Sequence, residues 1–124
     1  MVILATDAPL TSRELKRLAK RALFGLVRAG SLMNHGSGEY AVAFSTARVG
    51  ESLSSGHPEG GIVSPRQLNQ LFQGAAEAAE EAVINSLFRA ETMKGRADHC
   101  VKALPLERVL QLCKKFQQAA EENG

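Results

Sequence analysis

The scarcity of strand-forming segments is the feature that most constrains this chain. Among its 124 residues, only two segments, residues 1–5 and 39–46, have the apolar and β-branched composition of strands. The second segment alternates, with Tyr40, Val42 and Phe44 on one side. A ribbon of two strands is marginally stable by itself. We therefore expect both strands to pair with strands that this chain does not contain, from another chain or from another copy of itself.

The first predicted helix has two different faces. It begins at a capping box formed by Thr11 and Glu14 and ends near Ala29, just before Gly30. Its apolar face consists of Leu15, Leu18, Ala22 and Leu26. Its basic face consists of Arg13, Lys16, Arg17, Lys20, Arg21 and Arg28. Such a basic face could bind an anion or an acidic partner, although a solvated face is the more common case.

Two further helices follow residues 47–63, a glycine-rich stretch that is predicted to form a long surface loop. The longer helix begins at Ser64, with Pro65 in its first turn, and ends near Thr92. The last helix begins near Pro105. In both helices, apolar side chains at helical spacing are expected to face inward. In the longer helix these are Leu68, Phe72, Ala75, Ala79, Ala82 and Val83, and in the last helix Leu106, Val109, Leu110, Cys113 and Phe116.

Composition and charge exclude several classes of function. Fifteen Lys and Arg residues against thirteen Asp and Glu residues give a net charge of +2, which is too small to indicate binding to nucleic acid or to a membrane surface. No apolar run approaches the ~20 residues that span a bilayer, and the first residues lack the basic start of a signal peptide. Cys100 and Cys113 lack partners at metal-ligand spacing. His35, His57 and His99 have no carboxylate or serine at a spacing that indicates catalysis. We therefore expect a cytoplasmic protein with reduced cysteines and without a metal or another cofactor.

Four segments carry a combined signal that none of them carries alone. They read ATDAPL at 5–10, RLAKRA at 17–22 with RAG at 28–30, GSGE at 36–39 leading to AFSTA at 43–47, and ETMKGR at 91–96 with ALPL at 103–106. In this order and spacing they resemble the L-aminopeptidase/D-esterase (DmpA) family, to which β-peptidyl aminopeptidases and nylon-oligomer hydrolases are related. The resemblance extends from Met1 to about Leu112 without large gaps.

The resemblance implies an α/β fold of a particular kind. It is a four-layer α/β/β/α sandwich, to which residues 1–124 contribute about two strands and three helices as a single unit. The resemblance also implies a precursor that cuts itself into a long N-terminal chain and a short C-terminal chain, whose new N-terminal Ser or Thr is the nucleophile. The present chain resembles the short one, so the implied activity is hydrolysis of N-terminal aminoacyl amide or ester bonds. The implied partners are the long chain of the same precursor or other copies in an oligomer, and a peptide or aminoacyl amide substrate.

Ser37 and Glu39 match the serine and the acid that assist the nucleophile in this family. The resemblance implies that the Ser37 hydroxyl passes or orients a proton beside the nucleophile, while the Glu39 carboxylate holds Ser37 and the terminal amine. In an extended segment, side chains two residues apart point to the same side. Spacing alone would favour structural roles for both residues, and the resemblance reverses that preference. Asp7, in the exit loop of the first strand, is expected to be structural.

The nucleophile of the family pattern has no counterpart in the chain. It would fall about two residues before Met1, and Thr6 belongs to the ATDAPL segment itself. We therefore expect that the chain starts too late, that the gene product is truncated, or that catalysis has been lost. The open functions are a peptidase or amidase whose attacking group lies outside these residues, and an inactive homologue or fragment that acts by assembly. An unrelated anion- or nucleic-acid-binding module is disfavoured, because aromatic residues do not interleave with the basic ones.

Overall fold

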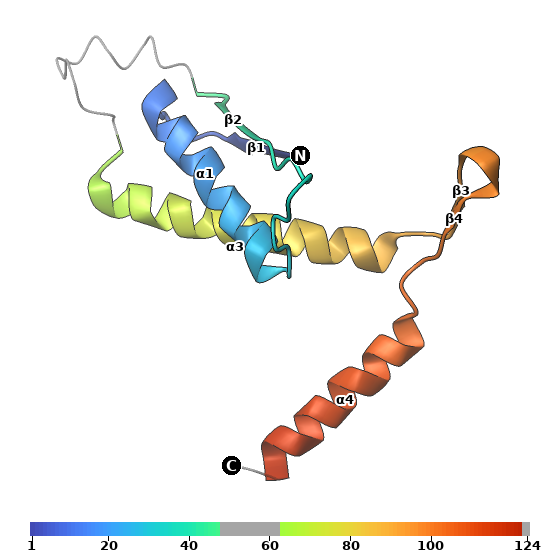
Figure 1. The fold of residues 1–124 in the computed structure, drawn as a ribbon. Helices are drawn as coiled ribbons and strands as arrows, with labels where there is room; N and C mark the ends of the chain where they lie inside the picture. Colours follow the sequence, from blue (N-terminus) through green and yellow to red (C-terminus); the bar gives the residue numbers. More distant parts are fainter. Residues whose placement is uncertain (48–62, 123–124) are drawn as a thin grey trace, which may run out of the picture. The chain divides into compact units, whose positions relative to one another are not determined.

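The computed structural model describes residues 1–47 and 63–122, so nearly all of the predicted glycine-rich loop lies outside the described residues. The chain divides into two compact units, Met1–Ile84 and Asn85–Gly124. The secondary structure elements, shown in Figure 1, are β1 (Val2–Thr6), α1 (Ser12–Arg28), β2 (Ala41–Ser45), α3 (Pro65–Arg89), β3 (Met93–Lys94), a 3-10 turn at Arg96–Asp98, β4 (Cys100–Val101) and α4 (Leu106–Glu122).

The two predicted strands are present in the first unit, and they pair with each other. β1 and β2 run parallel, in a register that places Val2 opposite Ala41 and Thr6 opposite Ser45. A parallel pair needs a crossover of a dozen or more residues, which the segment containing α1 provides. Within the described residues no third strand joins this pair, so each strand keeps one free edge. The prediction of partners outside the chain therefore applies to these two edges.

The starts of α1 and α3 are set by reciprocal hydrogen bonds, as the sequence predicts. At α1, the amide N–H of Glu14 donates to Thr11 Oγ1 at 3.3 Å, and that of Thr11 donates to Glu14 Oε2 at 2.8 Å. At α3, the Gln67 amide donates to Ser64 Oγ at 3.3 Å, and the Ser64 amide donates to Gln67 Oε1 at 3.0 Å. Each box satisfies two of the amides that a helix N-terminus leaves unpaired.

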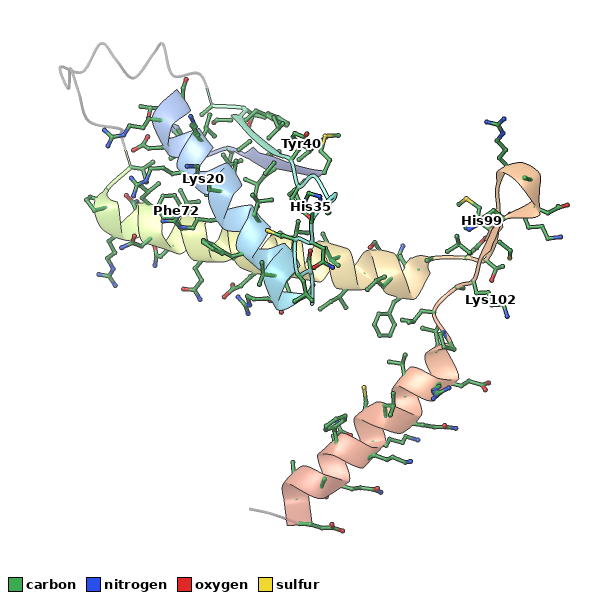
Figure 2. All side chains as sticks on the ribbon, in the orientation of Figure 1. Lys20, His35, Tyr40, Phe72, His99 and Lys102 are labelled. Atoms are coloured by element: carbon green, nitrogen blue, oxygen red, sulfur yellow. The ribbon has the colours of Figure 1, made fainter. Side chains whose placement is uncertain are left out.

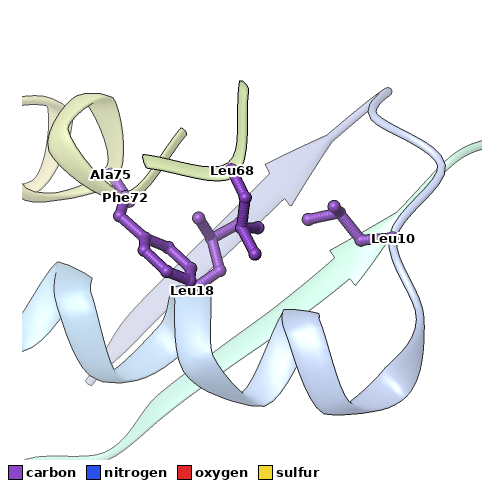
Figure 3. Packing of buried hydrophobic residues seen from close by; sticks show 5 residues of the cluster. All are labelled: Leu10, Leu18, Leu68, Phe72 and Ala75. Carbon is purple, nitrogen blue, oxygen red and sulfur yellow. The ribbon is translucent and has the colours of Figure 1, made fainter. Parts of the chain in front are cut away.

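Both helices pack on one face of the strand pair. Leu10, Leu18, Leu68, Phe72 and Ala75 form the buried cluster seen in Figure 3, and Leu4 of β1 packs against it. Among the other predicted core residues of α1 and α3, Ala22 and Ala79 are buried. Leu15, Leu26 and Val83 are only partly buried.

Ala82 was expected in the buried stripe of α3 and is exposed, so that prediction is wrong. The physical reason is the length of the two helices. α3 has 25 residues and α1 has 17, and α3 meets the last turns of α1 near Ala79 and Glu80. Beyond that point α1 no longer covers α3. Despite its length, α3 is too polar to cross a membrane, and no other helix in the described ranges is long and apolar enough to do so.

None of the described helices covers the opposite face of the strand pair. Ile3, Val42 and Phe44 point away from the helices, with 65%, 53% and 45% of their surfaces exposed. Ile3 lies opposite Val42 in the register, which makes the exposed patch continuous across both strands. The first unit thus has one helical layer and one sheet layer, which is half of the predicted four-layer sandwich.

In the second unit, the end of α3 is followed by a hairpin that the sequence did not predict. β3 and β4 are antiparallel, with Met93 opposite Val101. The Gly95 amide donates to the His99 carbonyl at 2.8 Å. Ala97 and Asp98 have φ angles of 55° and 59°, in the left-handed region. Alanine rarely adopts this region, so the sequence contains no turn signal there.

The inward orientation predicted for α4 is wrong within this chain. None of its residues is buried, and Leu110 and Phe116 are 59% and 76% exposed. The amphipathic spacing is real, but the described part of this unit contains no surface that covers the apolar face of α4. Of the residues predicted to face inward, only Val109 is partly buried. The others are exposed: Leu106, Leu110, Cys113 and Phe116.

The closest approach of α1 to α3 depends on Gly25. A Cβ atom at Gly25 would lie 2.3 Å from the Ala76 carbonyl oxygen and 2.8 Å from the Ala79 Cβ. These are contacts with the body of a helix, so a side chain cannot be accommodated without separating the two helices. One turn later, Arg28 forms an ion pair with Glu80 at 2.9 Å.

We predict that Gly25→Ala destabilises the protein by about 1–3 kcal/mol, because overpacking the helix contact outweighs the gain in helix propensity. Gly74→Ala is the matched control, since it is also a helical glycine and no atom lies within 4 Å of its added Cβ. The control should be neutral or stabilising by up to ~1 kcal/mol. Denaturant unfolding of both variants measures the difference, and equal stability of the two would contradict this packing.

Candidate functional site

The loop between α1 and β2 positions the predicted catalytic pair. Gly30, with a φ of 102°, ends α1. A turn follows in which the Ser37 amide donates to the Asn34 carbonyl at 2.9 Å, with Gly36 at a φ of 87°. A left-handed residue is well suited to a tight turn, and glycine adopts this conformation without steric cost. The turn delivers Ser37 to the segment that leads into β2.

Ser37 and Glu39 contact each other, whereas the catalytic role that the family resemblance implies for them stays a prediction. The Ser37 hydroxyl donates a hydrogen bond to Glu39 Oε1 at 2.5 Å. Ser37 is exposed and Glu39 is partly buried, so the pair is accessible from solvent in this chain. A hydrogen bond to an ionised acceptor is shorter and stronger than one between neutral groups. The carboxylate therefore fixes the orientation of the Ser37 hydroxyl.

The parallel register brings this pair to the beginning of β1. The Val2 amide donates to the Tyr40 carbonyl at 2.7 Å, and Val2 lies opposite Ala41. Tyr40, labelled in Figure 2, lies at the end of the strand pair where Figure 1 marks the N-terminus. Because the strands are parallel, both of them start at the same end of the sheet. Ser37 and Glu39 therefore approach the start of β1, although 35 or more residues separate them from it in the sequence.

At the opposite end of the strand pair, where β1 and β2 finish, hydroxyl groups make hydrogen bonds with structural roles. The Ser45 hydroxyl donates to the Ala8 carbonyl at 2.6 Å and accepts from the Ala47 amide at 3.1 Å. The Thr6 hydroxyl accepts from the Ala8 amide at 3.1 Å. The bond from Ser45 to Ala8 joins the AFSTA segment to the ATDAPL segment, and the other two bonds lie within these segments. Both family-like motifs thus stabilise the ends of β1 and β2, away from the predicted catalytic pair.

The remaining candidate residues do not form a second site within the described ranges. His35 lies in the loop before β2 and His99 in the hairpin of the second unit, and both are exposed (Figure 2). His57 lies outside the described residues. Across residues 1–47 and 63–122, no group of three or more His, Cys, Asp or Glu side chains could hold a metal ion.

Sequence reasoning missed the part played by Tyr40. Its carbonyl joins the start of β2 to β1, and its ring lies against Gly38, where an added Cβ would be 2.9 Å from Tyr40 Cε2. Gly38 is the residue between Ser37 and Glu39. The only sequence signal was the alternation of Tyr40 with Val42 and Phe44, which indicated a strand face and gave no hint of this contact.

The comparison with protein families decides the assignment. The model of peptidase family S58 matches residues 1–101. The chain belongs to peptidase family S58. Two curated relatives are the β-peptidyl aminopeptidases BapA of Sphingosinicella microcystinivorans, 37% identical over 97% of this chain, and of Sphingosinicella xenopeptidilytica, 37% identical over 92%. The chain spans only 31% and 29% of the lengths of these relatives.

Solved structures of similar proteins confirm the predicted fold class. The L-aminopeptidase D-Ala-esterase/amidase of Ochrobactrum anthropi, described as a prototype of the serine aminopeptidases and a variant of the Ntn hydrolase fold, matches 93% of this chain with a TM-score of 0.76 and 34% identity. The PH0078 protein of Pyrococcus horikoshii matches 92% with a TM-score of 0.74 and 43% identity. The chain covers 33% of each structure. It thus adopts the α/β arrangement of one third of a DmpA-like protein.

Proposed function

We propose that this chain is the short, C-terminal part of an autoprocessing aminopeptidase or amidase, which cleaves N-terminal aminoacyl amide or ester bonds. The supporting observation is the hydrogen bond from Ser37 to Glu39 at the edge of the sheet where β1 begins. Membership of peptidase family S58 and similarity to β-peptidyl aminopeptidases support the same reaction class. The attacking Ser or Thr hydroxyl comes from outside these 124 residues.

The chemistry requires a hydroxyl nucleophile, a base and a path for the proton. A hydroxyl at a chain terminus has its own amine nearby as the base. As its oxygen bonds to the substrate carbonyl carbon, its proton passes to the base and then to the departing amine, and the scissile C–N bond breaks. Water then hydrolyses the resulting ester and restores the hydroxyl. In this scheme Ser37 orients the proton beside the nucleophile, and Glu39 holds Ser37 and the terminal amine.

The register of the strand pair favours this placement of the nucleophile. Val2 lies opposite Ala41, and if this register continued, each earlier residue would lie opposite the residue that precedes Ala41 by the same number of positions. A residue two positions before Met1 would fall opposite Gly38. Gly38 lies between Ser37 and Glu39, so a Ser or Thr at that point would be next to both side chains. Close positioning of this kind is a major part of rate enhancement in enzymes.

The long N-terminal part of the same protein is the proposed partner. A depression of about 440 Å³ lies between α1 and the free edge of β2, lined by Leu15, Ala19 and Leu23. Another, of about 220 Å³, lies between α3 and β1, lined by Leu71 and Ala75. Both have apolar floors beside unpaired strand edges, which suits additional strands of the same sheet. The relatives are about three times as long as this chain, which leaves ample sequence to supply those strands.

We predict that Ser37→Ala and Glu39→Gln, introduced into the full protein, each lower kcat for hydrolysis of an aminoacyl p-nitroanilide by about 10²–10⁴-fold, the usual contribution of a positioned proton-transfer group. Ser31→Ala is the matched control. Ser31 is in the same loop, and its hydroxyl only accepts a long 3.4 Å bond from the Met33 amide. The control should keep nearly the full rate. Near-normal rates for Ser37→Ala and Glu39→Gln would mean that the pair is structural.

We also predict that residues 1–124 expressed alone do not hydrolyse aminoacyl amides. In the proposed function, both the nucleophile and the hydrogen-bond donors that stabilise the oxyanion of the reaction intermediate come from outside this segment. The measurement is the release of p-nitroaniline by the isolated chain, compared with a protein that includes the upstream coding sequence. Activity only in the longer protein supports the peptidase. Activity in neither supports the inactive assembly module, and clear turnover by the isolated chain would overturn the proposal.

A further inference from the structure

Two arginine side chains of α1 converge on one aromatic ring of α3. The guanidinium carbons of Arg17 and Arg21 each lie 4.9 Å from the centre of the Phe72 ring, and that of Arg21 is also 5.7 Å from the Phe24 ring. Phe72 is only 8% exposed and belongs to the core cluster, so its ring is fixed. Stacking on a fixed ring restrains both arginine side chains before any ligand binds.

The charges of these two arginines are not neutralised within the described part of the chain. Arg28, on the same helix, forms an ion pair with Glu80, but no carboxylate there lies within 4.0 Å of Arg17 or Arg21. Glu14, three residues before Arg17, and Glu77, five residues after Phe72, make hydrogen bonds to other groups. Glu14 accepts bonds from the amide and hydroxyl of Thr11, and Glu77 accepts from the Gln73 side chain at 2.8 Å.

The α3 surface next to these arginines adds no negative charge. The first twelve residues of α3, 65–76, contain amides and a further arginine but no Asp or Glu. Lys20 lies on α1 between Arg17 and Arg21 in sequence and adds to the local positive potential (Figure 2). Because both guanidinium carbons lie 4.9 Å from the same point, they are within 10 Å of each other. Two like charges on one helix surface raise the local positive potential, which attracts an anion.

We propose that Arg17 and Arg21 form a binding site for the dianionic phosphate group of a small molecule. A guanidinium group stacked on a ring still has N–H groups at its edge, and these match the oxygen atoms of phosphate in paired hydrogen bonds. Two guanidinium charges are compensated by one dianion, whereas a carboxylate compensates only one of them. The site lies on the outer side of the contact between α1 and α3, and it does not involve Ser37 or Glu39.

The test is a calorimetric titration of the full protein with inorganic phosphate at mildly alkaline pH, where phosphate is a dianion, and at constant ionic strength. We expect saturable binding that Arg17→Gln and Arg21→Gln each weaken at least ~10-fold, the effect of losing a charge-assisted hydrogen bond. Arg13→Gln is the matched control, because Arg13 is an exposed arginine of the same helix without a ring contact, and it should change the affinity less than about twofold.

Further arms of the experiment keep the proposal falsifiable if a glutamine variant fails to fold. Arg21→Lys keeps the charge and loses the paired geometry, so it should also weaken phosphate binding. Phenyl phosphate should compete with inorganic phosphate, and acetate at the same concentration should not. Equal losses in the Arg13, Arg17 and Arg21 variants, full affinity in Arg21→Lys, acetate binding as strong as that of phosphate, or no saturable binding would each overturn the proposal.

Discussion

The parallel pairing of β1 with β2 is the interaction on which the rest of this structure depends. It is made by main-chain hydrogen bonds, beginning with the Val2 amide and the Tyr40 carbonyl, and it fixes the register over five residues. Because the strands are parallel, the turn that holds Ser37 and Glu39 lies at the same end of the sheet as the start of β1. A one-residue slip would turn Leu4 away from the core and move the pair relative to β1.

The uncovered apolar surfaces follow from the same arrangement. One face of the strand pair is filled by α1 and α3, while Ile3, Val42 and Phe44 are exposed on the other. The apolar side of α4 is exposed as well. A stable protein rarely leaves this much apolar surface in contact with water. The chain spans about a third of each relative, and in the function proposed above these surfaces and the two free strand edges are where the long N-terminal part would pack.

Features that depend on neighbouring residues could be predicted from the sequence, and features that depend on distant contacts could not. The capping boxes at Thr11 and Ser64 were predicted because their bonds span three residues. The bond between Ser37 and Glu39 is equally local, although only the family resemblance suggested a catalytic role. The exposure of α4 was missed because amphipathic spacing identifies an apolar face without identifying its cover. The hairpin at Met93–Val101 was missed because its left-handed residues include an alanine.

The attacking group is proposed to lie immediately before β1, beside Ser37 and Glu39. The most direct measurement is intact-mass analysis with N-terminal sequencing of the native, active protein that carries this chain. We expect two chains, the shorter of which begins with Ser or Thr about two residues before Met1. An active protein that remains uncut, or whose short chain begins with a residue that has no hydroxyl group, would contradict it.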